Sequence, residues 1–249
     1  MTVESALGSR FFVDGYDISG DVGQGSCRIT IAPLDVSTID VGGMKRLRGR
    51  TSGEINWNVF FDDAASAEHV ALKAMNRSDR YGMWAHQCAA IGDSAIATRG
   101  KQMNYDWNFG ADGGAVGSIQ MLSSGAPIEF GQLLTPGKRT DTGATNGSSL
   151  DFGATDSTFG LAAYCFVTDF SGTDITIKLQ DSANNSAFSD ITGAAFTAFT
   201  AVGAQRLQTA VGGTVRRYVR VATTTSGGFT TCTFVVLFVR YSTTQTLYS

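Results

Sequence analysis

Charge is scarce in this sequence. Charged residues make up only 16% of the 249 residues and the formal net charge is -3, whereas an average globular protein is roughly 25% charged. A chain of this kind has no generally basic surface, so tight non-specific binding of nucleic acid by the whole surface is not expected. The 30 glycines, together with abundant Thr and Ser, favour β-sheet with many turns and surfaces covered by neighbouring subunits.

Histidine and cysteine are also rare. His69 and His86 have no Cys, Asp or Glu cluster at metal-ligand spacing beside them, so we expect no metal site. The cysteines, which form no CxxC pair, are Cys27, Cys88, Cys165 and Cys232. This spacing, together with the lack of a secretory leader at the Met1 end, favours reduced, buried thiols in a protein made in the cytoplasm.

Long apolar runs and catalytic motifs are missing as well. The longest apolar run, Phe234 to Val239, is far shorter than the about 20 residues that span a bilayer, so no membrane insertion is expected. Gly110 to Gly117 lacks the Lys-Ser/Thr of a phosphate loop and predicts a hairpin connection instead. Asp62-Asp63 is explained by helix capping. We therefore expect no catalytic residues and no cofactor, and a hydrolase ranks last among the alternatives.

What the sequence does contain is β-strand patterning. Asp14-Gly15 predicts a tight hairpin between Ser9 to Val13 and Tyr16 to Ile18. Apolar and polar residues alternate from Ser26 to Ile31 and from Glu54 to Phe61, which predicts strands with one buried face each. The apolar positions are Cys27, Ile29, Ile31, Ile55, Trp57, Val59 and Phe61.

One helix is predicted, from Ala64 to Met75, because this segment consists mostly of good helix formers with one apolar stripe. The stripe is Ala67, Val70, Ala71, Ala74 and Met75. Further strands are expected at Tyr81 to Ala89, Lys101 to Phe109, Ala115 to Ser123 and in the segment Pro127 to Leu134.

Between the two alternating strands lies a connection, Asp35 to Gly53, with almost no core-forming residues. It carries the cations Lys45, Arg46, Arg48 and Arg50. A compact domain rarely contains so long an unpaired connection unless it is functional or disordered. One interpretation is a solvated loop without a binding role. The other is an electrostatic contact with an adjacent copy, which we call the latch, with Asp35, Asp40 and Glu54 as possible complementary charges.

The second half of the sequence predicts a separate β module. Turn-forming residues from Thr135 to Ser149 predict a linker at 139–149 between domains at 1–138 and 150–249. Strands at sandwich-like spacing follow. They are Thr158 to Thr168, Asp174 to Gln180, Ala195 to Ala201, Arg206 to Thr209, Thr214 to Ala222 and Phe229 to Tyr241.

Arginines cluster around Tyr218 in this half. Arg216, Tyr218 and Arg220 would share one face of a strand and could form a surface patch for glycan or nucleic acid. The structural interpretation is that one arginine of the cluster, such as Arg217, lies near a core edge and pairs with an Asp.

The order of these segments resembles the major tail tube proteins of long, noncontractile bacteriophage tails, especially of phages that infect actinobacteria. The resemblance spans about residues 7 to 140. It is carried by Tyr16–Val22, Lys45–Gly49, Gly53–Phe61, Phe61–Ala65 and Pro127–Gly131 followed by Leu134-Thr135. The second half resembles the β-sandwich often appended to such proteins, through Ile177–Ala183, Gly203–Leu207 and Arg216–Val221.

This resemblance implies a mainly β fold: a tail-tube β-sandwich or barrel with one flanking α-helix, and a C-terminal antiparallel β-sandwich, Ig-like or jelly-roll-like. It also implies self-assembly, in the host cytoplasm, into homohexameric rings that stack into a tube through which DNA passes without specific binding. Tape-measure, tail-terminator and distal tail proteins would be its other partners. The C-terminal sandwich would project outward from the tube.

Two groups of residues take roles in this implied tube. The loop with Asp40, Lys45, Arg46, Arg48 and Arg50 would contact the adjoining ring. The polar face of the strand Glu54 to Phe61, with Glu54, Asn56 and Asn58, would face a wet channel. A neutral-to-acidic wall suits this role, because DNA carries one phosphate charge per about 1.7 Å and would adhere to a cationic channel.

The alternative is a distal tail or host-adhesion protein. Its C-terminal sandwich would bind a cell-surface glycan through Tyr164, Tyr218 or the nearby arginines. Copy number separates the two, since hundreds of copies per virion favour the tube and a few copies favour the adhesion protein.

Overall fold

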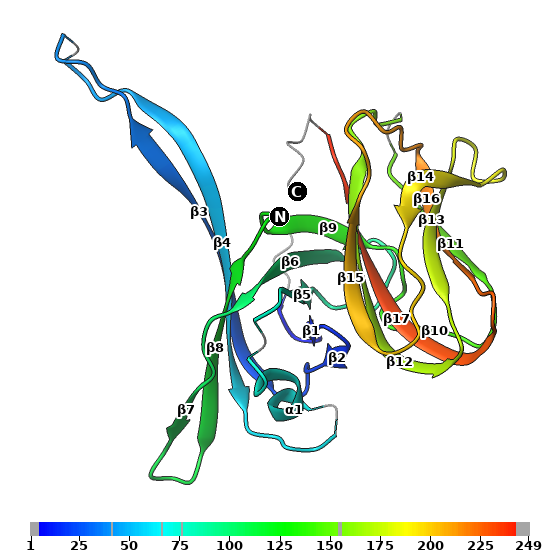
Figure 1. Ribbon diagram of the computed structural model, residues 1–249, viewed down its shortest axis with the longest axis horizontal. Helices are drawn as coiled ribbons and strands as arrows, with labels where there is room; N and C mark the ends of the chain where they lie inside the picture. Colours follow the sequence, from blue (N-terminus) through cyan, green and yellow to red (C-terminus); the bar gives the residue numbers. More distant parts are fainter. Residues whose placement is uncertain (1–4, 41, 66, 76, 154–155, 243–249) are drawn as a thin grey trace.

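The computed structural model describes residues 5–242 apart from 41, 66, 76, 154 and 155. It is mainly β, as predicted, and its strands form one sheet of 13 strands and one of four (Figure 1). Every pairing between named strands is antiparallel. Among the described residues the single α-helix is α1 (Glu68–Leu72).

The described part of the N-terminal half contains nine strands. They are β1 (Arg10–Val13), β2 (Tyr16–Asp17), β3 (Val22–Asp35), β4 (Arg46–Phe60), β5 (Arg80–Ala85), β6 (Ser94–Gln102), β7 (Asp106–Phe109), β8 (Ala115–Ser123) and β9 (Glu129–Leu133). The predicted hairpin is confirmed by the pairing of β1 with β2, with Asp14 at the turn at a φ of 52°. The segment predicted as one strand from Lys101 to Phe109 is instead the end of β6, a break, and β7.

The predicted helix exists but is shorter than the segment Ala64 to Met75. Asp62 accepts a hydrogen bond from the Ala64 N–H at 2.9 Å, in a turn before the helix. The predicted helix-capping role of Asp62-Asp63 is wrong, because the N-cap residue is Ala67, which makes no side-chain hydrogen bond. The helix ends at Leu72. Arg80 donates to the Ala71 carbonyl at 2.6 Å and the Gln102 amide donates to the Leu72 carbonyl at 3.0 Å. These side chains satisfy the last carbonyls of the helix, so no further turn is needed to do so.

The prediction of an unpaired connection from Asp35 to Gly53 is wrong. β3 and β4 pair continuously from Val22 opposite Val59 to Asp35 opposite Arg46, with two register shifts. Only the ten residues 36–45 connect them. We call the distal part of this hairpin, residues 29–53, the arm; it projects away from the rest of the molecule (Figure 1). Its strands lack a buried face, so hydrophobic alternation does not reveal them.

The core of the N-terminal half lies between two layers of the large sheet. One layer contains β3, β4, β8 and β7, and the other contains β1, β5, β6 and β9, with β8 also pairing with β6. The predicted buried positions Ile55, Trp57 and Val59 lie in this core with Ile119 and Met121. Phe61 was also expected on the buried face but is exposed, because β4 ends at Phe60.

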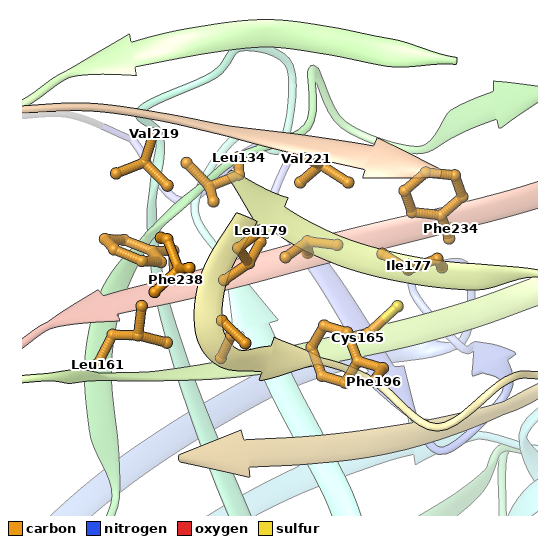
Figure 2. Packing of buried hydrophobic residues seen from close by; sticks show 14 of the residues in the cluster. Leu134, Leu161, Cys165, Ile177, Leu179, Phe196, Val219, Val221, Phe234 and Phe238 are labelled. Atoms are coloured by element: carbon orange, nitrogen blue, oxygen red, sulfur yellow. The ribbon is translucent and has the colours of Figure 1, made fainter. Parts of the chain in front are cut away.

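The C-terminal half is an antiparallel sandwich. Its strands are β10 (Arg139–Asp141), β11 (Asn146–Asp151), β12 (Leu161–Gly172), β13 (Thr176–Ser182), β14 (Ser189–Ala195), β15 (Gly203–Gln208), β16 (Tyr218–Thr224) and β17 (Phe229–Arg240). Figure 2 shows its core, in which Ile177 and Val221 of the four-stranded sheet face Phe234 and Phe238 of β17. Strand order in that sheet is β11-β16-β13-β14.

The two halves share a sheet and a core. Leu133 and Gln132 of β9 pair with Leu237 and Phe238 of β17. A second buried cluster combines Phe12 and Met83 with side chains of β12 and β17. The two aromatic rings of Phe12 and Phe166 lie 6.0 Å apart within it.

The segment 139–149, predicted as a linker, contains β10 and the first residues of β11. β10 pairs with β17 and β11 pairs with β16. Arg139 and Asp141 form a nearly buried ion pair at 2.7 Å. The turn-forming composition here belongs to short strands at sheet edges, where the Thr145 hydroxyl donates to the Gly143 carbonyl at 2.8 Å.

Candidate assembly surface

The polar residues predicted to face a channel lie together on one face of the sheet β3-β4-β8-β7. Asn58 lies opposite Ser118 on one side and Gln24 on the other, and Ser118 lies opposite Asp106. Because paired residues of neighbouring strands point to the same face, these side chains form a row across four strands. The next row toward the arm contains Gln120, Asn56 and Ser26, and the row after it contains Leu122, Glu54 and Arg28.

This polar face is close to neutral. The Gln120 amide donates to Glu54 at 3.2 Å, and the Arg28 guanidinium lies 4.0 Å from Glu54. The remaining side chains of the rows are mostly amides and hydroxyls. The three residues predicted from the sequence, Glu54, Asn56 and Asn58, are therefore brought together, and the surrounding polar residues were not predicted.

Both edges of this sheet layer are open. β3 pairs with β4 and β7 pairs with β8, and neither has a second partner among the described residues. Each pairing is antiparallel, so β3 and β7 run in opposite directions. Unpaired N–H and C=O groups on such edges are templates for pairing with another chain. An antiparallel match between β3 of one copy and β7 of another is therefore geometrically possible.

The predicted latch cations lie on the arm. A register shift between Ile31 and Pro33 places Arg48 opposite Pro33 and Arg46 opposite Asp35. Within the described residues, none of Lys45, Arg46, Arg48 and Arg50 forms an ion pair. Residue 41, within the predicted contact loop, lies outside the described residues.

The proposed complementary acids are engaged locally. Asp35 accepts the Ser37 N–H at 2.9 Å, and Asp40 accepts the Thr38 hydroxyl. Hydrogen bonds from Ser37 and Thr38 hold the pKa values of these two carboxyls below their usual range. The four arm cations therefore remain available to a partner.

The arm also exposes apolar side chains. Ile29 and Ile31 were predicted to be buried but are exposed, because none of the described residues covers this end of β3. Leu34 and Leu47 lie opposite each other and are 54% and 57% exposed. The other exposed apolar residues of the arm are Val36, Ile39 and Met44. Concentrated exposure of this kind marks an interaction surface.

The opposite end of β4 is acidic and aromatic. Phe60 and Phe61 are exposed there, next to Asp62 and Asp63. The β7–β8 turn with Asp112 lies at the same end of the molecule, far from the arm (Figure 1). The ring of Phe61 contacts the rings of His69 at 5.0 Å and Trp107 at 5.2 Å, and Tyr105 accepts or donates a hydrogen bond with His69 at 2.7 Å. The ring contacts account for His69 without a metal.

The arginine cluster of the C-terminal half is engaged in structural contacts. Arg216 pairs with nearly buried Asp181 at 2.6 Å, and Arg217 pairs with Asp151 at 2.6 Å. Hydrogen bonds from Arg217 lower the pKa of Asp151 to about 2. An arginine of the cluster does pair with a nearly buried Asp, but it is Arg216 and not Arg217, whose pair with Asp151 is exposed.

Two more residues considered for glycan binding, Arg220 and Tyr164, are also engaged or buried. Arg220 donates to Gln180 at 2.7 Å and lies over the Phe188 ring at 4.0 Å. Tyr164, the residue considered for glycan binding, is fully buried. That part of the prediction is wrong, because Tyr164 lies in the shared core instead of on the surface.

The structure confirms the predicted free, buried thiols for three of the four cysteines and contradicts the prediction for Cys27. Cys88, Cys165 and Cys232 are free and buried, and burial raises the pKa of Cys88 to about 11 and of Cys232 to about 12. Cys27 is free but exposed on β3. The alternation of Ser26 to Ile31 predicted burial there, but β3 runs out along the arm.

Two further features were not predicted from the sequence. Phe109, at the end of β7, is 79% exposed; the alternation of Trp107 and Phe109 with polar residues is its signal in the sequence. Glu129 forms a buried network with Arg206 and two tyrosines. Nothing in the sequence pairs these residues, because they come from distant segments.

Over the described part of the chain, no group of three or more His, Cys, Asp or Glu could hold a metal ion. No helix in that part is long and apolar enough to cross a membrane.

Comparison with known proteins gives no family assignment. No protein-family model matches the chain, and no curated protein matches it. Among solved structures, a chain from the virion of a native gene transfer agent particle is 16% identical, with 51% of this chain and 98% of that chain covered and a TM-score of 0.42. A chain from the tail of an empty gene transfer agent particle with C6 symmetry is 15% identical, with coverages of 51% and 98% and a TM-score of 0.40.

A third solved structure covers more of the chain. The Dit protein of SPP1, a hub of the adsorption apparatus of phages that infect Gram-positive bacteria, is 11% identical over 93% of this chain and 99% of that chain, with a TM-score of 0.31. With TM-scores below 0.5, these three likenesses carry no weight in assigning a function to this chain.

Proposed function

We propose that this chain is the tube-forming subunit of a phage tail. Copies would join edge to edge into hexameric rings, and the rings would stack into a hollow tube that conducts DNA. The observation that carries the proposal is the sheet β3-β4-β8-β7, which has two open antiparallel edges and one polar face. The sequence resemblance to tail tube proteins supports it independently.

The open edges at β3 and β7 would join neighbouring copies within a ring. β3 of one copy would pair with β7 of the next, continuing the alternation of strand directions around the ring. A closed circle of sheets leaves no open edge, which protects a protein with such edges from indiscriminate aggregation. A closed ring of copies also gives every subunit the same two contacts.

The polar face would line the lumen. Its rows of amides and hydroxyls, with Arg28 close to Glu54, give a wall without excess positive charge. DNA phosphates bind cationic surfaces by releasing counterions, so a wall of this composition would let duplex pass. Glu54, Asn56 and Asn58 would lie at its centre.

The arm would make the contact between rings. Its cations Lys45, Arg46, Arg48 and Arg50 and its exposed apolar residues extend along the direction of β4, away from the acidic and aromatic end. In a stack of rings, arms of one ring would reach the acidic end of the next. Opposite charges on the two ends of one molecule favour this head-to-tail arrangement.

The C-terminal half would project outward. It packs against the layer β1-β5-β6-β9, on the side away from the polar face of the other layer. If that face lines the lumen, the C-terminal half lies on the outside of the tube. The tape-measure, tail-terminator and distal tail proteins implied by the resemblance would then contact the lumen or the ends of the tube.

Electron microscopy of the concentrated purified protein tests this proposal, together with copy number in virions. The expected result is rings or tubes and hundreds of copies in the tail shaft. Discrete monomers at high concentration, with no density for this chain in the shaft, would contradict it.

A further inference from the structure

A cavity of about 310 Å³ lies beneath the first residues of β3. Its apolar wall comes from the second layer of the N-terminal half and from β4, and its other wall is the strand segment 22–27. The apolar lining residues are Phe11, Val22, Ile55, Trp84 and Ile96. Since β3 is an edge strand, the cavity lies at the open margin of the sandwich.

The cavity is open because Gly25 has no side chain to fill it. A Cβ on Gly25 would lie 2.6 Å from the Phe11 ring, so a side chain at this position would displace that ring and occupy the space. Ser9 also lines the cavity, and its buried hydroxyl has no hydrogen-bond partner within the described residues. The cavity is thus apolar with one unsatisfied polar group, a composition suited to an apolar side chain carried on a peptide backbone.

The other edge of the same sheet layer carries an exposed aromatic residue. Phe109 lies opposite Ala115 at the end of β7 and shares the face of Trp107, which packs into the core. Phe109 itself extends past the core and is 79% exposed. It is therefore on the face that, at the β3 edge, borders the cavity.

The register of a closed ring brings these two features together. Strands in closed barrels tilt by roughly 35–45°, which shifts neighbouring strands by about 4 Å along their length. Four strands per copy then give an offset of about 16 Å, or about five residues, between one copy and the next.

Without an offset Phe109 would lie level with Gly20, because Phe109 is opposite Ala115, Phe61 bonds to Ala115, and the preceding Phe60 bonds to Asp21. An offset toward the start of β3 would leave β7 without a partner strand, so the offset is toward the arm. It places Phe109 about five residues further on, opposite Gly25, which lies opposite Trp57 on the core face. Residues 22–27 of β3 line the cavity.

We propose that Phe109 of one copy fills the cavity beneath β3 of the neighbouring copy in the ring. This inference rests on the proposed tube function and names its lateral contact. Charge complementarity supports it on the other face of the sheet. The same offset brings exposed Asp106 of β7 to the level of Arg28 of β3, whose side chain is 73% exposed.

Cross-linking through Cys27 tests the contact. Cys27 lines the cavity and is exposed, whereas the other three cysteines are buried. The variant Phe109→Cys, treated with a short thiol cross-linker, should give a ladder of covalent multimers on a denaturing gel. The ladder should be absent from wild type, from Phe109→Cys with Cys27→Ser, and from Asn108→Cys, whose side chain points to the opposite face.

If the Phe109→Cys substitution itself weakens assembly, a second variant still tests the contact. Phe109→Ala should raise the protein concentration needed for ring formation by at least about tenfold, while Asn108→Ala should leave it within about twofold. Monomeric Phe109→Ala should keep the unfolding midpoint of wild type, since Phe109 is exposed in the monomer.

The outcomes separate this inference from the proposed function. Rings that form equally well in Phe109→Ala, or that form in Phe109→Cys without a Cys27-dependent ladder, would overturn the contact and leave the tube proposal standing. Wild-type protein that forms no rings at all would overturn both.

Discussion

Arg206 and Glu129 form a two-pronged ion pair that joins the two halves of the molecule. The guanidinium nitrogens lie 2.8 Å and 2.9 Å from the two carboxylate oxygens, and both side chains are nearly buried. The hydroxyls of Tyr164 and Tyr241 donate to the same carboxylate at 2.5 Å and 2.7 Å. Because β9 carries Glu129 and β15 carries Arg206, the network ties the C-terminal sandwich to the N-terminal half.

Removing one partner of this pair should strongly lower the free energy of unfolding. Arg206→Met should lower the free energy of unfolding by about 3–5 kcal/mol, because it leaves the Glu129 charge buried without a cation. The double variant with Glu129→Gln should lose less than Arg206→Met alone, since glutamine carries no charge and still accepts from the tyrosines. Urea unfolding of the monomer measures both, and a single variant within about 1 kcal/mol of wild type would contradict the role of the pair.

Reversing the arm charges should impair stacking without unfolding the monomer. Arg46→Glu with Arg48→Glu should reduce tube yield at low salt by at least about fivefold, because about 1 kcal/mol is lost per arm. The effect should weaken at high salt, where exposed charges are screened over a few ångströms. Arg46→Lys with Arg48→Lys keeps the charge and is the control. Unchanged tube yield in the glutamate variant, counted by electron microscopy, would rule out the arm cations as the latch.

Adding positive charge to the polar face should slow DNA without preventing assembly. Asn56→Arg with Asn58→Arg should still form tubes, but the assembled tube should retain duplex DNA that wild-type tubes release, with a retention that falls steeply as salt rises. Thr197→Arg with Thr200→Arg adds the same charge to an exposed part of the C-terminal half. Equal DNA retention by both variants in a co-sedimentation assay would place the polar face outside the lumen.

Stability should depend on pH through Glu68. Burial, helped by the nearby Asp21 charge, raises the pKa of this carboxyl above 4.5, despite hydrogen bonds from the Asp62 N–H and the Tyr105 hydroxyl. A group with a raised pKa in the folded state contributes stability below its unfolded pKa and loses it as pH rises through the folded value. Wild type should therefore gain stability relative to Glu68→Gln as pH falls from about 7 to about 4.5. Denaturant unfolding at both pH values measures the difference in the free energy of unfolding between wild type and Glu68→Gln. A difference that does not change with pH would show that the pKa of Glu68 is not raised.

The predictions from sequence succeeded where burial leaves a pattern. The alternation of Ile55, Trp57 and Val59 predicted the core face of β4, and Asp14-Gly15 predicted the β1–β2 hairpin. The paired strands of the arm were not predicted, because strands without a buried face leave no such pattern. These strands are held by backbone pairing with both faces exposed. Ile29 and Ile31 alternate with polar residues as buried residues do, but none of the described residues covers them.

The candidate surface was predicted in part. Glu54, Asn56 and Asn58 were placed on one polar face from β4 alone, and the structure adds Gln24, Ser118 and the other residues opposite them. Cross-strand partners of this kind depend on the register between distant segments, which the sequence of one strand does not contain. The exposed edges of β3 and β7, and the place of Phe109 on one of them, depend on the same register.

The most direct test of the central claim is a cryo-electron microscopy reconstruction of assembled protein or of intact tails. It should show closed rings in which β3 of each copy is hydrogen-bonded antiparallel to β7 of its neighbour, with Asn56 and Asn58 facing the channel. A reconstruction in which the outer edge of β3 is exposed to solvent, or in which this chain forms no ring, would contradict the account.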